Sequence, residues 1–175
     1  RAKGRGWVFT PKHFIDFGTR GSVDMALSRL AQAGEIRRIG RGLYDYPQLH
    51  DKLGALTPDA EMIAQAVSAQ SGDRLAPSAA AAANRLGLST QVPARTSYAT
   101  TGRTRVRQAA GRSVTLKHSR APVLGNASEA ANGVVQYLAG LGRDNINADA
   151  ISKLAARLDD KDVQTLLKGR AQMPG

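Results

Sequence analysis

Residues 34–47, GEIRRIGRGLYDYP, constrain the fold more than any other stretch of the chain. Two runs rich in strand-favouring residues lie on either side of a short turn, in which Gly40 and Gly42 flank Arg41. Glycine permits the positive φ angles that tight hairpin turns need, and it leaves steric room beside the arginine. The segment therefore predicts a β-hairpin over residues 35–46, with Arg41 at its tip.

The hairpin follows directly after a predicted amphipathic helix in residues 19–34, TRGSVDMALSRLAQAG. A further helix is expected upstream, because Thr10 and Pro11 are typical of a helix start and Gly18 of a helix end. A strand-like run, Trp7–Phe9, comes before both helices. The order of the predicted elements is that of a winged helix-turn-helix domain: strand, helix, short turn, amphipathic helix and hairpin. The apolar stripe of the amphipathic helix has the spacing of one helical face: Val23, Ala26, Leu27 and Leu30.

The three-helix form of such a domain has one more helix before Trp7. Because the chain starts at Arg1 and not at methionine, we expect this first helix to be truncated. The predicted organisation is a winged helix-turn-helix DNA-binding domain in residues 1–47, a linker in residues 48–57 and a C-terminal domain in residues 58–175. The expected fold class is α+β and mainly helical, with a mixed α/β C-terminal domain.

The C-terminal domain is expected to contain strands at residues 95–102, 103–108 and 112–119, where β-prone residues lie between turn signals. The first C-terminal helix is expected to have Thr57 as its cap, and the last one Asp159 or Asp160. The predicted helices cover residues 57–72, 77–88, 127–142, 148–158 and 159–169.

Positive charge lies in two separate blocks of the sequence. The chain carries a net charge of +11, and its pI is near 10.7. Residues 1–50 hold nine basic and four acidic residues, and residues 95–120 hold seven basic and no acidic residues. Residues 51–94 and 121–175 are nearly neutral. Two basic blocks favour a polyanionic partner, most often nucleic acid, over an evenly charged soluble surface.

The predicted DNA-binding residues belong to the amphipathic helix and the hairpin. A winged helix places the N-terminal end of one helix in the major groove, here Thr19–Met25, and the hairpin tip on the flanking backbone or minor groove. Alternatively, the helix arginines only keep an outer face soluble. Since side chains alternate along a strand, only one of Arg37 and Arg38 is expected to join Arg41. The predicted DNA-binding set is Lys12, Arg20, Ser22, Met25, Arg29, Arg37, Arg38 and Arg41.

The second basic block lies in the strand region of the C-terminal domain. Arg103, Arg105 and Arg107 alternate, so on one strand they would form a basic row. We expect the block to be a second DNA or RNA surface or a landing site for an acidic partner, or alternatively a solvated sheet face or a flexible loop. If this block lies on the DNA duplex that the winged helix binds, its arginines extend the DNA footprint. The residues of this predicted second basic surface are Arg103, Arg105, Arg107, Arg112 and Lys117.

The sequence contains little that favours an enzyme. It has no cysteine and only three histidines, which lie far apart without metal-ligand spacing. A phosphate-binding loop of the type G-x-x-x-x-G-K-[ST] is absent. No apolar run is long enough to span a membrane. We therefore expect a cytoplasmic protein that is not an enzyme and that binds neither a metal nor a cofactor.

Three blocks of the chain resemble the AbiEi-type antitoxin and transcriptional regulator family: GWVFTPKHF, ALSRLAQAGEIRRIGRGLYDYP and AAAANRLGLSTQVPA. Arg41–Tyr44 and Asn84–Thr90 carry most of the resemblance, which extends from Gly6 to about Leu167. It implies an N-terminal winged helix that represses its own operon. It also implies a C-terminal domain that antagonises a nucleotidyltransferase-type toxin of a phage-defence toxin–antitoxin operon.

The implied partners are the double-stranded DNA of the protein's own promoter and the cognate toxin, contacted directly or indirectly. An inverted repeat bound by two copies is expected, because helix-turn-helix proteins often use two-fold sites. The alternative is an interaction module whose basic surface docks an acidic protein or an RNA, without sequence-specific DNA binding.

Overall fold

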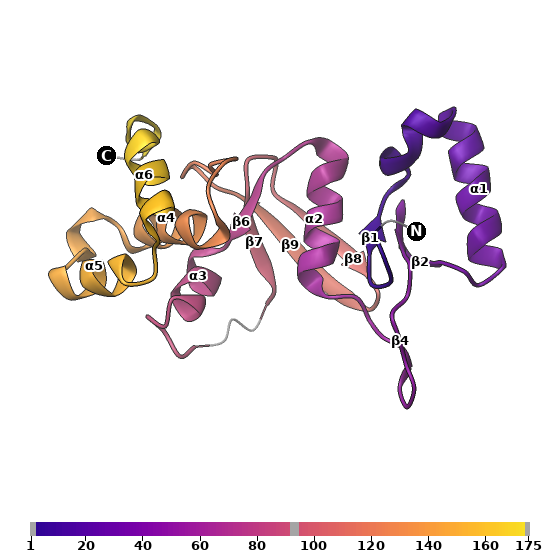
Figure 1. Cartoon of the computed structure of the whole chain (residues 1–175), viewed down its shortest axis with the longest axis horizontal. Helices are drawn as coiled ribbons and strands as arrows, with labels where there is room; N and C mark the ends of the chain where they lie inside the picture. The colour runs from indigo at the N-terminus through magenta and orange to yellow at the C-terminus, as the bar shows by residue number, and fades with distance from the viewer. Residues whose placement is uncertain (1–2, 92–94, 174–175) are drawn as a thin grey trace. The chain divides into compact units, whose positions relative to one another are not determined.

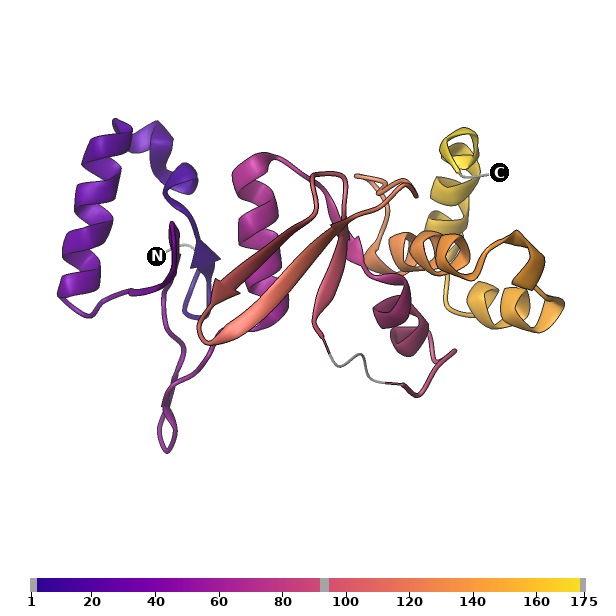
Figure 2. The same ribbon diagram turned by 180° about the vertical axis from the view of Figure 1, so that it is seen from behind.

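The protein has a mixed α/β fold with three small sheets in the part of the chain that the computed structural model describes, residues 3–91 and 95–173 (Figures 1 and 2). Contacts divide the chain into two compact units, which we call unit 1 and unit 2. Unit 1 comprises Arg1–Gly72 and Val106–Val114, and unit 2 comprises Asp73–Arg105 and Thr115–Gly175. None of the described helices is both long and apolar enough to cross a bilayer.

Unit 1 begins with the element order that the sequence predicts. Its first elements are β1 (Val8–Phe9), η1 (Pro11–Phe17), α1 (Arg20–Gln32), β2 (Arg37–Gly40) and β3 (Leu43–Asp45). β3 is the central strand of an antiparallel sheet, with β1 on one side and β2 on the other. The predicted strand, second helix and hairpin are confirmed, whereas the segment after Thr10 forms a 3₁₀ helix and not an α-helix.

The predicted linker region contains structure of its own. β4 (Leu49–His50) and β5 (Gly54–Ala55) form a two-stranded hairpin. α2 (Ala60–Ser71) starts with Asp59 at its cap position, two residues after the predicted Thr57, because the buried Pro58 anchors extended chain before the helix. α2 contacts β1 and so belongs to unit 1. The predicted division into residues 1–47, 48–57 and 58–175 stays a prediction about domains.

Unit 2 contains four α-helices among its described residues and part of a four-stranded sheet, because residues 106–114 of that sheet belong to unit 1. The strands lie in the order β6 (Leu75–Pro77), β7 (Ser97–Thr100), β9 (Arg112–His118) and β8 (Arg105–Ala109), and β7 and β9 are parallel. The helices are α3 (Ala79–Arg85), α4 (Glu129–Leu141), α5 (Ala148–Ala155) and α6 (Asp160–Lys168), with short 3₁₀ turns η2 (Arg143–Asn145) and η3 (Arg170–Gln172).

The sequence predicted these helices and three of the four strands. Asp159 caps α6, as one of the two expected alternatives, by accepting a hydrogen bond from the backbone N–H of Asp162 at 2.7 Å. β6 was not predicted, because three residues before a helix cap carry no period-two signal. Val92–Ala94, at the end of the third family-like block, lie outside the described residues.

The core of unit 1 joins η1, α1 and the sheet through aromatic and aliphatic side chains. Val23 and Leu27 are buried, as the predicted apolar stripe requires, but Ala26 and Leu30 are exposed beside a groove of about 560 Å³. Tyr44 is buried, and Tyr46 is partly buried and packs against the same cluster. The cluster of buried residues is Phe9, Val23, Leu27, Ile36 and Tyr44.

Small residues let α3 and α4 of unit 2 approach closely. A Cβ added at Gly133 would lie 3.5 Å from the Cβ of Ala82, an ordinary contact, whereas one added at Gly140 would lie 2.6 Å from the Cβ of Ala79. Real Cβ atoms do not approach so closely, so a side chain at Gly140 must force the two helices apart. The alanine-rich helix is thus matched to glycine on its neighbour.

We expect Gly140→Ala to lower the free energy of unfolding by about 1 kcal/mol, because the clash exceeds the gain in helix propensity. Gly133→Ala is the matched control in the same helix, and it should be neutral or stabilising by up to about 1 kcal/mol. Urea unfolding followed by circular dichroism measures both. Equal effects of the two substitutions would contradict the packing described here.

Candidate nucleic-acid interface

The predicted DNA-binding residues of the amphipathic helix lie on α1, and each is exposed: Arg20, Ser22, Met25 and Arg29. Thr19 caps the helix, because its hydroxyl accepts a hydrogen bond from the backbone N–H of Ser22 at 3.3 Å. The Nε of Arg20 donates to both carboxylate oxygens of Asp24, at 2.8 and 3.0 Å. Because both side chains of this ion pair are exposed, it contributes only about 0.5 kcal/mol and can exchange for another acceptor.

Lys12 lies on η1 and makes a contact with a distant part of unit 1. Its Nζ donates a hydrogen bond to the backbone carbonyl of Gln70 on α2, at 3.1 Å. The lysine therefore helps to hold η1 near the end of α2, and its ammonium group is still exposed.

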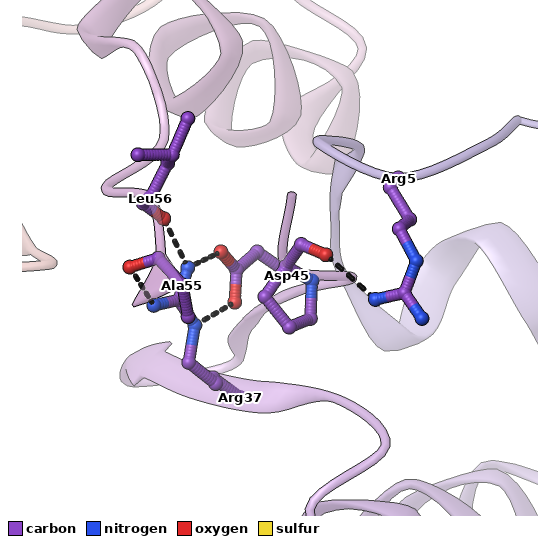
Figure 3. A network of polar contacts seen from close by, with 6 residues as sticks. Arg5, Arg37, Asp45, Ala55 and Leu56 are labelled. Atoms are coloured by element: carbon purple, nitrogen blue, oxygen red, sulfur yellow. Dashed lines mark hydrogen bonds and ion pairs between the residues drawn. The ribbon is translucent and has the colours of Figure 1, made fainter. Parts of the chain in front are cut away.

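Arg37 is the centre of a polar network inside unit 1 (Figure 3). Its Nε donates to Oδ1 of Asp45 at 3.0 Å and its Nη2 to Oδ2 at 2.5 Å. The same guanidinium donates to the backbone carbonyls of Ala55 and Leu56, at 3.4 and 2.6 Å. Asp45 is only 1% exposed, and its hydrogen bond raises the pKa of Arg37 above the ordinary value of an arginine. Arg37 is thus engaged in holding the β2–β3 hairpin against the β4–β5 hairpin.

A second arginine, Arg5, completes the same region of unit 1. Its Nη1 donates to the backbone carbonyl of Pro47 at 3.0 Å (Figure 3). Its guanidinium carbon lies 4.7 Å from the ring centroid of Tyr46. This distance is within the range of a cation–π contact. Two of the arginines in the first basic block therefore have structural partners.

Arg38 and Arg41, in contrast, are exposed at the end of the β2–β3 hairpin. Arg38 pairs with Tyr44 across the strands, and the register shifts between Arg38 and Gly40, as in a β-bulge. Because the irregularity follows both Arg37 and Arg38, it does not turn Arg37 to the side of Arg38. The engagement of Arg37 with Asp45 argues against its assignment as a DNA contact.

The tip of the β8–β9 hairpin lies against β2 within unit 1. Ala110 donates its backbone N–H to the carbonyl of Ile39 at 2.8 Å. A Cβ added at Gly40 would lie 2.8 Å from the carbonyl oxygen of Gln108, so a side chain there would push the two segments apart. Ala109 is 2% exposed. The second basic block, about 70 residues later in the sequence, is thus joined to the first by backbone contact.

Exposed arginines of both blocks gather around this contact, and we call them the composite basic surface: Arg38, Arg41, Arg107 and Arg112. Each lies within two residues of a backbone group that makes the Ile39–Ala110 or Gly40–Gln108 contact. Within the described ranges, none of the four forms an ion pair with an acidic side chain. Four such positive charges next to one backbone contact favour a polyanionic ligand.

The other residues of the predicted second basic surface, Arg103, Arg105 and Lys117, belong to unit 2. Arg103 precedes β8, so Arg103, Arg105 and Arg107 do not form a row on one strand. Arg105 forms an ion pair with Asp73 at 2.7 Å, and both side chains are less than one-fifth exposed. Lys117 is exposed on β9. The predicted row was wrong because one of its members precedes the strand and another is needed inside unit 2.

Sequence reasoning missed the residues that organise the site. Gly40 was assigned to the turn, whereas its lack of a side chain is needed for the approach of the β8–β9 hairpin. Asp45 was not singled out, although a carboxylate directly opposite Arg37 in a hairpin is a cross-strand pairing that the sequence could have indicated.

No group of three or more His, Asp or Glu side chains that could hold a metal ion occurs within residues 3–91 and 95–173. His13 serves a local role, because its Nδ1 lies 3.2 Å from the backbone N and from the hydroxyl of Thr10 at the start of η1. That the chain is not an enzyme stays a prediction.

We expect Arg37→Ala to lower the free energy of unfolding of unit 1 by about 2–3 kcal/mol, because it leaves the buried Asp45 carboxylate without its cation. Arg38→Ala is the matched control, and its effect should stay within about 0.5 kcal/mol. Fluorescence of Trp7, the only tryptophan of the chain, reports urea unfolding of unit 1. Equal destabilisation by the two substitutions would rule out the structural role of Arg37.

Residues 1–166 match a family of unknown function, DUF6088, so the match extends over nearly all of the chain and over both units. Comparisons with curated proteins and with solved structures gave no significant match. By this match the chain belongs to the DUF6088 family.

Proposed function

We propose that the protein is a sequence-specific, double-stranded-DNA-binding autorepressor that acts as the antitoxin of a toxin–antitoxin operon. In this proposal η1, α1 and the β2–β3 hairpin of unit 1 work as a winged helix, with α1 as the recognition helix and the hairpin as the wing. The observation that carries the DNA-binding part is the composite basic surface, in which arginines from two distant basic blocks gather at the tip of this hairpin.

Two kinds of contact are assigned to different elements of unit 1. Arg20 at the start of α1 can release Asp24 and donate both arms of its guanidinium to a guanine, since the exposed ion pair costs little to break. Arg38 and Arg41 of the hairpin, with Arg107 and Arg112, neutralise phosphates on the flanking backbone. The first contact gives sequence preference, and the second gives affinity for any duplex.

The antitoxin part of the proposal is supported by the resemblance of the sequence blocks around Arg41–Tyr44 and Asn84–Thr90 to AbiEi-type antitoxins. It makes a nucleotidyltransferase-type toxin the second partner and the cytoplasm the site of action. A neighbouring gene for such a toxin, whose growth inhibition this chain relieves on co-expression, is the expected outcome. Unrelieved inhibition by that toxin would overturn the antitoxin part and leave the DNA-binding part intact.

Fluorescence anisotropy with labelled duplexes tests the DNA-binding part. We expect the protein's own promoter to bind at least about a thousandfold more tightly than unrelated DNA at physiological salt. Arg20→Ala should reduce the preference for the promoter by about 1–3 kcal/mol, whereas Arg41→Ala should weaken binding to both duplexes alike. The matched control is Arg157→Ala, which removes an exposed arginine of unit 2. Equal affinity of the unaltered protein for promoter and unrelated DNA would contradict the proposal.

A further inference from the structure

Unit 2 contains an apolar groove that the proposed DNA-binding function does not use. The groove has a volume of about 560 Å³ and is formed by α4, α6 and the segments that precede and follow them. On α6, Val163 and Leu167 lie one turn apart and are 37% and 55% exposed, and Ile146 after α4 is 36% exposed. Soluble proteins seldom leave several large aliphatic side chains exposed together unless a partner covers them.

The charged residues of the groove are all positive. Arg120, Arg143 and Arg170 line it, from three separate segments, and no acidic residue lies among its described lining residues. All three are exposed, and in the described part of the chain none of them pairs with a carboxylate. Arg143 and Arg170 follow helix C-termini, where a positive charge is favourable. Arg120 lies in a loop before α4, so no helix C-terminus accounts for its charge there. An apolar floor with a cationic rim is complementary to a ligand with an apolar face and negative flanks.

The shape of the groove favours a helix over a small ligand. Three of its apolar lining residues, Ile146, Val163 and Leu167, are themselves exposed, so a small molecule would leave much of this surface uncovered. The exposed aliphatic side chains of α6, Val163 and Leu167, lie at positions i and i+4, which is the spacing of one helical face. A second helix can lay its own apolar stripe along such a face, as amphipathic helices do in hydrophobic grooves.

We propose that this groove of unit 2 binds an acidic amphipathic helix of a partner protein. The aliphatic side chains of the partner helix would lie between α4 and α6, and its Glu or Asp side chains would pair with Arg120, Arg143 and Arg170. This inference does not depend on DNA binding, because no residue of the composite basic surface lines the groove.

The test uses the full chain and designed peptides in fluorescence anisotropy. The probe is a fluorescein-labelled amphipathic peptide of about 18 residues, with Leu at helical spacing and Glu on both flanks. A second peptide carries Gln in place of Glu, and a third has the acidic composition in an order without helical amphipathicity. We expect the acidic amphipathic peptide to bind at least about tenfold more tightly than either of the other two.

Matched variants separate binding in the groove from attraction to a basic protein. Leu167→Asp should weaken binding of the acidic amphipathic peptide at least about tenfold. Ile151→Asp adds the same charge at a side chain of α5 that is equally exposed, at 54%, and does not line the groove, so it should leave binding unchanged. The double variant Arg143→Ala, Arg170→Ala should weaken binding of the acidic amphipathic peptide several-fold and leave the affinity for the Gln peptide unchanged.

Three results would overturn the proposal. They are no saturable binding of the acidic amphipathic peptide, the same affinity for the acidic peptide without helical amphipathicity, or equal losses of peptide affinity with Leu167→Asp and Ile151→Asp. Circular dichroism of each variant checks that the fold is retained. Because DNA binding is measured separately on unit 1 variants, failure here and failure of the proposed function can be told apart.

Discussion

The close approach of Gly40 to the β8–β9 hairpin is the contact on which the candidate interface depends. A hydrogen bond from Ala110 to the carbonyl of Ile39, at 2.8 Å, joins two backbone segments that lie about 70 residues apart in the sequence. Gly40 makes the approach possible, because any side chain there would meet the carbonyl of Gln108. Without this contact, the two basic blocks would be separate charged segments, each with a weaker field.

The structure also divides the arginines by what they touch. Arg37 and Arg105 are held by buried or mostly buried carboxylates, and their charges stabilise the fold. Arg38, Arg41, Arg107 and Arg112 make no such pair among the described residues, so their charges are available to a ligand. A strongly basic composition therefore overstates the surface that can meet DNA, and the partners of each arginine define that surface better than the net charge.

Much of the fold could be predicted from local sequence signals. The amphipathic spacing gave α1, the glycine-flanked turn gave the β2–β3 hairpin, and cap residues such as Asp159 gave the ends of helices. These features depend on neighbours within about four residues along the chain, where periodicity and capping act. The structured hairpin within residues 48–57 and the strand β6 escaped prediction, because short strands are fixed by pairing and not by their own sequence.

The candidate site was predictable only in part, for the same reason. Arg38 and Arg41 could be found from the hairpin alone, whereas their proximity to Arg107 and Arg112 depends on a contact between distant segments. Arg37 and Arg105 form ion pairs with Asp45 and Asp73, and Asp73 is 32 residues from its arginine. Periodicity carries no information on such long-range pairs.

The salt dependence of duplex binding by Arg112→Ala tests most directly whether the second basic block belongs to one DNA surface with the hairpin of unit 1. Arg112 lies on β9, outside any helix or hairpin that a winged helix alone would supply. If it neutralises a phosphate, its removal should lower the slope of log K against log salt by about 0.9, and Arg157→Ala should leave the slope unchanged. The same slope for Arg112→Ala, Arg157→Ala and the unaltered protein would contradict a composite DNA surface.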